Sequence, residues 1–308
     1  MDGWEAEDRM LLKQLEYFVA VAHERHFARA AQVCGVSQPT LSDGVRRLEQ
    51  ELGMPLIRRG HTFQGLTPEG SRLVVWAQRM VDDRRALHDA AAVLRAGLNG
   101  TLRVGVVPAA TTTVARVLDR FCAEHPLVEV HIESMLSTND VISQISTYDL
   151  DAGICYPVGN EMVRYRPLYD ETWAFLAPQH MVDDSAESIT WAQAASYPLV
   201  MLGTSLHGMS PMIGAFEASG AVPHVTIETD SVASLFGFVN TGRWASIVPD
   251  RWVLDSGQVT DLALLELVEP VVQTRIVLAH HSGEPMSPVV EALVSSAVSV
   301  CSRAPGVG

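Results

Sequence analysis

The 308-residue sequence is poor in cysteine and contains no long apolar run. Its four cysteines, Cys34, Cys122, Cys155 and Cys301, are far apart, and none stands in a CxxC pair. This spacing argues against a metal or disulfide role and is typical of small buried side chains in a reducing compartment. No segment approaches the ~20 apolar residues that span a bilayer, and the acidic start MDGWEAEDRM lacks the order of a signal peptide. We therefore expect a cytoplasmic protein that uses no membrane as a partner.

Catalytic and cofactor motifs are also missing. The sequence has no glycine-rich dinucleotide loop, no P-loop and no HExxH pair. The pentapeptide GTSLH at 203–207 is similar to a GxSxG nucleophile elbow, but His207 stands where the tight turn requires glycine. His280 and His281 lie in an expected strand, so their rings would point to opposite faces of the sheet. We therefore expect no enzyme, no catalytic residue, no metal site and no cofactor.

Negative charge dominates the chain, but its distribution is uneven. The net charge is −14; residues 1–90 hold 12 Lys/Arg and 13 Asp/Glu, whereas residues 91–308 hold 10 and 23. Seven arginines and four acids lie between residues 25 and 72, so this front segment is locally basic. The length favours two or three structural units, and a partner must be considered separately for each part.

The first ninety residues have the pattern of a helix-turn-helix. Apolar residues at helical spacing predict a first helix around 15–22, a short second helix around 27–33 and a third helix in SQPTLSDGVRRLEQELG at 37–53. Ser37 is the expected N-cap of the third helix, and Gly53 is its expected C-cap. In a helix-turn-helix the second helix of the pair enters the major groove of DNA. A generic three-helix packing unit is the alternative, because periodicity alone does not separate the two.

A basic hairpin is expected next, in GMPLIRRGHTFQGLT. Two short strands, 56–59 and 63–67, would flank a turn at Gly60 and His61. Such a hairpin beside a helix-turn-helix is a wing, and it would carry Arg58, Arg59 and His61 toward DNA phosphates or the minor groove. The alternative is a solvated basic hairpin without a partner.

A long helix is expected from Thr67 and Pro68 to about residue 98, with Thr67 as its N-cap. A heptad-like seam of seven residues follows it: Leu73, Ala77, Met80, Arg84, Leu87, Ala91 and Leu94. Such a seam suits a helix pair between two subunits, although it could also pack on its own domain. We favour dimerisation, through Leu73, Met80, Leu87 and Leu94.

The resemblance of this part of the chain to a known family rests on LEYFVAVAHERHFARAAQVCGVSQPTLSDGVRRLEQELGMPLIRRG, followed by LTPEG. From about Leu12 to Leu94 the chain resembles the N-terminal domain of LysR-type transcriptional regulators. The resemblance implies a winged helix-turn-helix, a dimerising linker helix and a C-terminal effector domain of periplasmic-binding-protein type. It further implies four partners: double-stranded promoter DNA, a small-molecule effector, a second copy of the chain in a dimer or tetramer, and RNA polymerase.

The same resemblance implies a DNA-contacting face on the third helix. The implied residues are Gln38, Pro39, Thr40, Ser42, Arg46 and Arg47, to which we add Arg29, Ser37, Asp43, Arg58, Arg59 and His61. Two departures from the family pattern stand out: His26 occupies the usual place of a serine cap, and Asp43-Gly44 occupies a place where larger residues are common. Asp43 either accepts a hydrogen bond from a cytosine amino group or pairs with a neighbouring arginine and orients it; we favour the second.

Strand and helix patterns alternate from Thr101 onward and predict a parallel α/β sheet. Two sets of such units predict two lobes, joined by crossing strands at WAFLAP (173–178) and TRIVLAHH (274–281). We therefore expect an α/β chain with the following parts: a winged helix-turn-helix at 1–67, with a leader at 1–11; a linker helix at 68–98; and an effector domain at 99–308, with lobe I at 101–175 and 274–303 and lobe II at 176–273.

A cleft between two lobes is the usual place for a ligand. Helix starts at the cleft offer free N–H groups, and hydroxyl-rich starts favour an anionic effector such as a carboxylate. The candidate residues are Thr111, Thr112, Thr138, Asn139, Thr204, Ser205 and His207. Simple helix capping is the alternative for the hydroxyls, and a surface loop is the alternative for His207. A plain solute-binding protein would lack residues 12–94, and a redox sensor would need a cysteine pair in one loop.

Overall fold

The computed structural model describes residues 4–59, 63–203, 210–254, 261–283 and 285–301. The chain divides into two compact units, Met1–Arg95 and Ala96–Gly308. Within these described ranges, none of the helices is long and apolar enough to cross a membrane.

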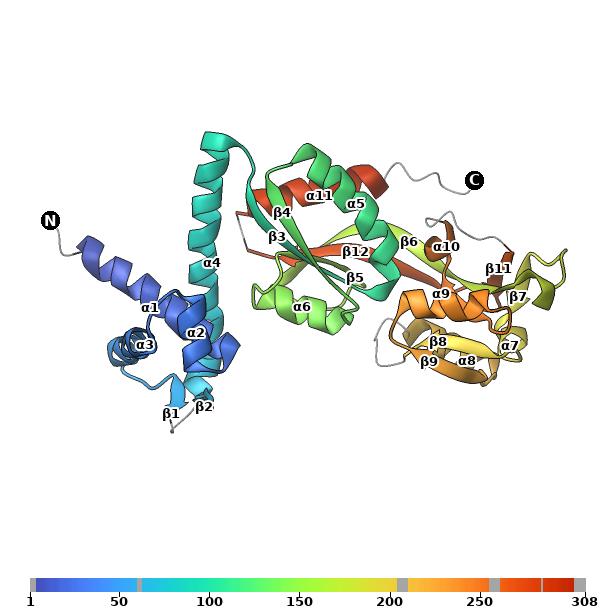
Figure 1. The fold of residues 1–308 in the computed structure, drawn as a ribbon, viewed down its shortest axis with the longest axis horizontal. Helices are drawn as coiled ribbons and strands as arrows, with labels where there is room; N and C mark the ends of the chain where they lie inside the picture. The colour runs from blue at the N-terminus through green and yellow to red at the C-terminus, as the bar shows by residue number, and fades with distance from the viewer. Residues whose placement is uncertain (1–3, 60–62, 204–209, 255–260, 284, 302–308) are drawn as a thin grey trace. The chain divides into compact units, whose positions relative to one another are not determined.

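The first unit contains the predicted helices and hairpin (Figure 1). Its elements are α1 (Trp4–Glu24), α2 (Phe27–Val33), α3 (Gln38–Leu52), β1 (Ile57–Arg59), β2 (Phe63–Leu66) and α4 (Pro68–Ala96). The prediction of a leader at 1–11 is wrong for residues 4–11, because α1 begins at Trp4. Glutamate, alanine, methionine and leucine favour helix in this stretch, and no proline interrupts them.

The helix ends follow the capping residues that the sequence predicts. Ser37 Oγ accepts a hydrogen bond from the backbone N–H of Thr40 at 3.3 Å. Gly53 closes α3 at a φ of 68°, a left-handed conformation that glycine adopts without a steric penalty. Thr67 Oγ1 accepts from the N–H of Gly70 at 2.8 Å. His26 replaces the usual serine cap, since its Nδ1 accepts from the N–H of Ala28 at 3.2 Å.

The packing of α1 on α3 explains Gly44. A Cβ atom at this position would lie 2.4 Å from Cδ2 of Tyr17, which is closer than side chains pack. The Tyr17 ring is 8% exposed and belongs to the same core as Phe18, Leu41 and Val45. A side chain larger than glycine at this position would therefore require the Tyr17 ring to shift.

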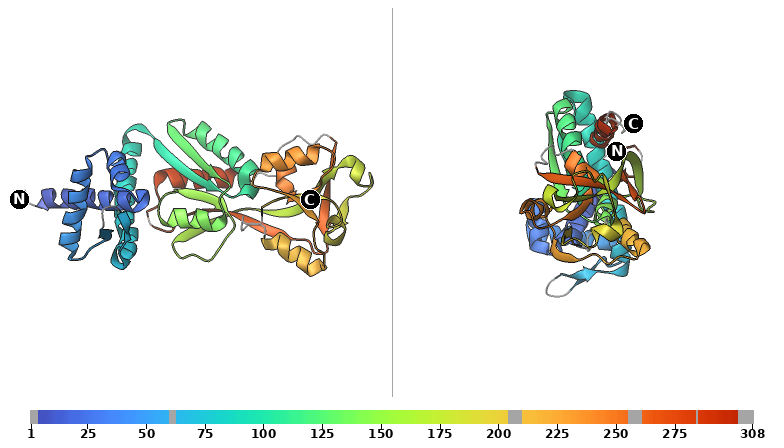
Figure 2. Two further views of the ribbon diagram at one scale, coloured as in Figure 1. Left: turned by 60° about the horizontal axis from the view of Figure 1, so that its bottom comes forward. Right: turned by 90° about the vertical axis from the view of Figure 1, so that its right-hand side faces the viewer.

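The second unit is a two-lobed α/β structure. Lobe I contains β3 (Gly100–Val106), α5 (Thr111–Glu124), β4 (Val128–Ser134), α6 (Thr138–Ser146), β5 (Ala152–Cys155) and α11 (Pro288–Cys301). Lobe II contains β7 (Ser188–Thr190), α7 (Trp191–Ala194), β8 (Leu199–Leu202), α8 (Ser210–Ser219), β9 (Val225–Thr229), α9 (Val232–Asn240), β10 (Ser246–Pro249), α10 (Asp250–Leu254) and β11 (Leu262–Val268). The long strands β6 (Val163–Pro178) and β12 (Gln273–His281) run from one lobe toward the other (Figures 1 and 2).

The sheet is mixed, whereas the sequence predicted a parallel one. Its strand order is β4-β3-β5-β12-β6-β11-β7, and β10 also pairs with β6. β3 is parallel to β4 and to β5, but β12 is antiparallel to both β5 and β6. The two crossing strands cause the difference, because they run in opposite directions between the lobes.

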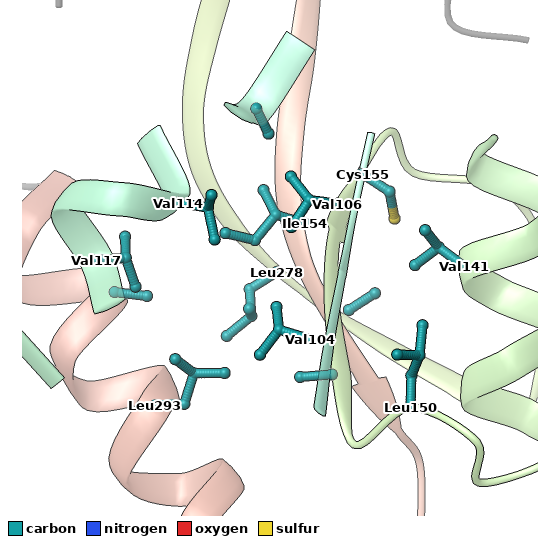
Figure 3. Close-up of a cluster of buried hydrophobic side chains, with 14 of the residues drawn as sticks. Val104, Val106, Val114, Val117, Val141, Leu150, Ile154, Cys155, Leu278 and Leu293 are labelled. Carbon is teal, nitrogen blue, oxygen red and sulfur yellow. The ribbon is translucent and has the colours of Figure 1, made fainter. Parts of the chain in front are cut away.

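Helices cover both faces of the lobe I sheet (Figure 3). Val114 and Val117 of α5 lie with Leu293 of α11 on one side of the sheet, and Val141 of α6 lies on the other. A separate cluster around Trp191, Phe175 and Phe216 forms the core of lobe II. Each lobe therefore has its own apolar core.

The close approach of Gly44 to Tyr17 predicts the effect of one added methyl group. We expect Gly44→Ala to lower the free energy of unfolding of the first unit by about 1–3 kcal/mol, as overpacking of a core does. Calorimetric melting of the full chain measures the change. Gly214→Ala in α8 is the matched control, because its Cβ would meet nothing within 4 Å. A Gly44→Ala protein as stable as the original would contradict this account of α1 packing on α3.

Candidate DNA-binding face and effector pocket

The predicted DNA-contacting side chains lie on the exposed face of α3. Leu41, Val45 and Leu48 of this helix are fully buried. The exposed residues at the helix start and on its opposite face are Ser37, Gln38, Pro39, Thr40, Asp43, Arg46 and Arg47, and Ser42 is half-buried. The helix therefore separates an apolar face from a polar one, as the sequence predicted.

Asp43 and Arg46 form an exposed ion pair, with Nη1 of Arg46 3.3 Å from Oδ1 of Asp43. Both side chains are more than half exposed, so the pair stabilises the fold little. The contact agrees with the hypothesis that Asp43 orients a neighbouring arginine.

The other predicted basic contacts differ in how they are held. Arg29 donates to the backbone carbonyl of Glu24 at 2.6 Å and forms an ion pair with the Glu24 carboxylate. Arg58 is exposed on β1. The side chain of Arg59 and the whole of His61 lie outside the described residues.

The seam predicted on α4 divides into two parts. Leu73 and Ala77 pack against the core of the first unit. Met80 and Leu87 are 45% and 71% exposed, and Trp76 adds a third exposed apolar side chain. Arg84, which interrupts the seam, pairs with Glu16 of α1. The side chain of Leu94 lies outside the described residues.

Two of the predicted effector hydroxyls form hydrogen bonds within the chain. Thr111 Oγ1 donates to the carbonyl of Pro108 at 2.7 Å, and Thr138 Oγ1 accepts from the N–H of Tyr156 at 3.4 Å. Thr112 Oγ1 is buried and has no partner among the described residues, whereas Asn139 is exposed. The remaining candidates, Thr204, Ser205 and His207, lie outside the described part of the chain.

A pocket that is partly open to solvent lies between the two lobes. Lobe I contributes Val107, Pro108, Ala109, Leu136 and Tyr156, and the rest of the lining is Trp173, Leu202, Ile247, Pro249 and Trp252. None of the four predicted effector residues that the structure describes belongs to this lining. Sequence reasoning missed all ten lining residues that the structure describes, because they come from segments up to about 145 positions apart and share no motif.

The two tryptophans of the pocket wall differ in their hydrogen bonding. Trp252 Nε1 donates to the carbonyl of Ala109 at 3.0 Å, so a lobe II side chain is bonded to the lobe I backbone. Trp173 Nε1 is buried and has no hydrogen-bond partner among the described residues.

A buried carboxylic acid lies behind the pocket wall. Glu171 is 1% exposed, and its Oε1 accepts from the hydroxyl of Tyr156 at 2.9 Å and from that of Thr274 at 3.1 Å. Its Oε2 has no partner in the described part of the chain. Burial raises the pKa of Glu171 to about 7, and the nearby Asp250 adds to this effect while Arg251 opposes it. Tyr156 therefore connects a pocket of apolar walls to an acid that holds its proton up to about neutral pH.

Comparisons with known proteins agree with this architecture. Residues 12–71 match the model of the bacterial regulatory helix-turn-helix protein, lysR family, and residues 95–302 match the LysR substrate binding domain. The chain belongs to the LysR family. It is a LysR-type DNA-binding transcriptional regulator with an effector-binding domain, and the fold class predicted from its sequence is confirmed.

Named relatives of this LysR-type regulator cover nearly its whole length. It is 31% identical to the SDS degradation transcriptional activation protein of Pseudomonas sp. (strain ATCC 19151) over 292 residues, 92% of this chain and 94% of the relative. It is 26% identical to the DNA-binding transcriptional dual regulator OxyR of Escherichia coli (strain K12) over 289 residues, 93% and 94% of the two chains.

Solved structures of full-length relatives have the same fold. A full-length variant of OxyR from Pseudomonas aeruginosa superimposes with a TM-score of 0.77 at 27% identity, covering 94% of this chain and 96% of that one. Full-length CbnR, in complex with its target DNA, gives a TM-score of 0.61 at 19% identity, covering 94% and 99%, which shows a shared fold.

The surroundings of Cys155 determine how reactive its thiol is. The next cysteine along the sequence is Cys301, since residues 156 to 300 contain none. Cys155 is buried in lobe I, and burial raises the pKa of its thiol to about 12. A thiol with so high a pKa is a poor nucleophile at neutral pH, so Cys155 is suited to packing rather than to redox chemistry.

The raised pKa of Glu171 predicts a pH-dependent stability. The folded state keeps a proton that the unfolded chain, with an ordinary pKa of 4.5, releases. The stability from this group is therefore complete below pH 4.5 and falls as pH rises toward 7. Relative to the original protein, Glu171→Gln should gain roughly 2–3 kcal/mol in unfolding free energy between pH 5 and pH 8. Thermal or urea unfolding at both pH values measures this change.

Asp170→Asn is the control for this experiment. Asp170 is the exposed neighbour of Glu171, and its hydrogen bonds to Arg275 lower its pKa. Its carboxylate stays charged from pH 5 to pH 8, so the difference between this variant and the original should stay constant. The same pH trend in both variants would show that the change does not come from Glu171.

Proposed function

We propose that this regulator binds promoter DNA as a dimer through the exposed face of α3 and responds to a small molecule held in the pocket between the lobes of its second unit. The observation that carries the DNA-binding half of the proposal is the two-sided nature of α3. Its apolar face is fully buried, and its polar face presents hydrogen-bonding and basic side chains. We assign the protein to the cytoplasm and expect RNA polymerase as a further partner.

The order of side chains along α3 suits a recognition helix. In helix-turn-helix proteins the N-terminal residues of this helix contact base edges. Gln38 and Thr40 stand there, and Ser37 caps the same turn. Arg46 and Arg47 lie two turns further along, where contacts to phosphates supply affinity rather than sequence selectivity. The acidic charge of residues 91–308 does not oppose this binding, because salt screens charges beyond ~8–10 Å.

Dimerisation is the second part of the proposal. Trp76, Met80 and Leu87 expose apolar side chains on α4, and clustered apolar exposure of this kind marks protein–protein contact sites. A two-fold dimer reads two half-sites on DNA and so doubles its contacts. We propose that the part of the α4 seam beyond Ala77 pairs with a second copy, and that a tetramer forms from two such dimers.

The pocket between the lobes is the proposed effector site. A position between two lobes is a common one for small-molecule sites. Both lobes contribute to the pocket walls, so a ligand there can favour one arrangement of the lobes over another. The described lining is apolar and aromatic and offers no nucleophile, which supports a binding role rather than a catalytic one.

Arg46→Ala tests the DNA-binding face. We expect a roughly 10-fold or greater loss of affinity for the regulator's own upstream DNA, measured by fluorescence anisotropy at fixed salt. If Asp43 acts by orienting Arg46, the double variant with Asp43→Ala should lose little more than Arg46→Ala alone. Arg275→Ala is the matched control, because it removes another exposed arginine paired with an aspartate. Unchanged affinity of Arg46→Ala would exclude this side chain from the DNA interface.

Leu87→Glu tests the dimer. A buried charge without a partner opposes association, so the variant should shift from dimer toward monomer in sedimentation or light-scattering measurements. Val222→Glu is the control, since Val222 is 88% exposed and lies in the second unit. Equal masses for the two variants would assign the dimer contact to another surface.

A further inference from the structure

We propose that the pocket between the lobes binds an uncharged, mainly hydrocarbon molecule that carries one hydroxyl group, and that Trp173 Nε1 donates a hydrogen bond to this hydroxyl. The inference rests on the proposed function, since it names the chemical class of the effector. It replaces the anionic effector that the hydroxyl-rich helix starts suggested.

The composition of the pocket wall supports an uncharged ligand. Of the ten lining residues that the structure describes, seven are aliphatic or proline, the other three are Tyr156, Trp173 and Trp252, and none carries a charge. An ionised group placed among such side chains loses its hydration without gaining a partner, which is strongly unfavourable. A hydrocarbon chain or ring loses only unfavourable contact with water there.

The backbone at the lobe I side of the pocket offers few free donors for an anion. The N–H of Val107 donates to Ile154 O at 3.1 Å, and that of Ala110 donates to Val107 O at 3.0 Å. Pro108 has no N–H. The N–H of Leu136 donates to Val106 O at 3.3 Å. Three backbone N–H groups at this side of the pocket are therefore already used within the chain.

Among the described side chains of the wall, one polar atom has no hydrogen-bond partner. The hydroxyl of Tyr156 is bonded to Glu171, and Nε1 of Trp252 is bonded to Ala109 O. Trp173 is 3% exposed, yet its Nε1 has no partner among the described residues. A buried donor without a partner destabilises the protein, so a ligand that supplies an acceptor gains this hydrogen bond in addition to apolar contact.

The charges around the wall also oppose a carboxylate. Asp250 follows the lining residue Pro249, and Glu171, which accepts the hydroxyl hydrogen bond of Tyr156, becomes charged as pH rises above about 7. Arg251, which follows Asp250, has its Cζ 4.8 Å from the centre of the Tyr169 ring. A neutral hydroxyl avoids repulsion from the acids and needs no cation.

The test compares three probes that share one chain and differ in the head group: 1-octanol, sodium octanoate and octylamine. Isothermal titration of the full-length protein at pH 7.5 should show binding of 1-octanol with a negative heat-capacity change, the mark of apolar burial. Octanoate and octylamine should bind at least about 10-fold more weakly, because each brings an ion into an apolar wall. Equal or tighter binding of either ion, or no binding of 1-octanol, would overturn the proposal.

Two pairs of variants place the binding in this pocket. Trp173→Phe removes the donor but keeps an aromatic ring, and it should weaken 1-octanol about 2- to 10-fold. Trp244→Phe is its control, because Trp244 does not line the pocket. Leu136→Trp narrows the pocket and should abolish binding, whereas Leu127→Trp, at a 64% exposed position, should not. Equal effects within either pair would place the 1-octanol elsewhere and overturn the proposal.

Binding of the upstream DNA by the same preparations separates this inference from the proposed function. A protein that binds its DNA but prefers octanoate retains the proposed function and loses only the effector class. A protein that fails to bind DNA loses the proposed function, whatever the octanol result.

Discussion

The antiparallel pairing of β6 with β12 is the constraint on which the second unit depends. The pairing extends from Thr172 opposite Gln273 to Val163 opposite His281. Beyond it, β6 continues into lobe II and pairs with β10 and β11. One strand therefore belongs to both lobes: Leu168 packs in the core of lobe I, and Trp173 packs in the core of lobe II. Any change in the angle between the lobes must bend the few residues between these two positions.

Glu171 lies at this transition, and its burial has an energetic cost that the rest of the fold must offset. Its carboxyl bonds to Tyr156, which follows the lobe I strand β5, and to Thr274 at the start of the shared pairing. These two hydroxyls stabilise one oxygen and leave the other without a partner in the described chain. An arrangement of this kind is not the best one for stability alone. It places a polar group with one unpaired oxygen where the lobes meet, beside Tyr156 of the candidate pocket.

Local features of the fold were predictable from the sequence, and pairing over long distances was not. Ser37, Gly53 and Thr67 determine helix ends through contacts within a few residues, and the structure has each of them as expected. The direction of β12 depends instead on which distant strand it meets, and the pattern of apolar residues is the same for either direction. The predicted parallel sheet was wrong for that reason. The sequence did not predict β7, because it has only three residues. It did not predict β11 either, because apolar and polar residues do not alternate in LALLELV.

The two candidate sites differ in predictability on the same physical ground. One helix carries most of the DNA-binding face, so the spacing of residues along α3 determines which side chains share that face. The departures from the family pattern on this unit are explained by packing and capping: Gly44 leaves room for Tyr17, and His26 caps α2 through its ring nitrogen. No single element carries the candidate effector pocket. Its walls come from loops and strand ends that only the completed fold brings together, and its character is set by which hydroxyls and N–H groups the chain has already used internally.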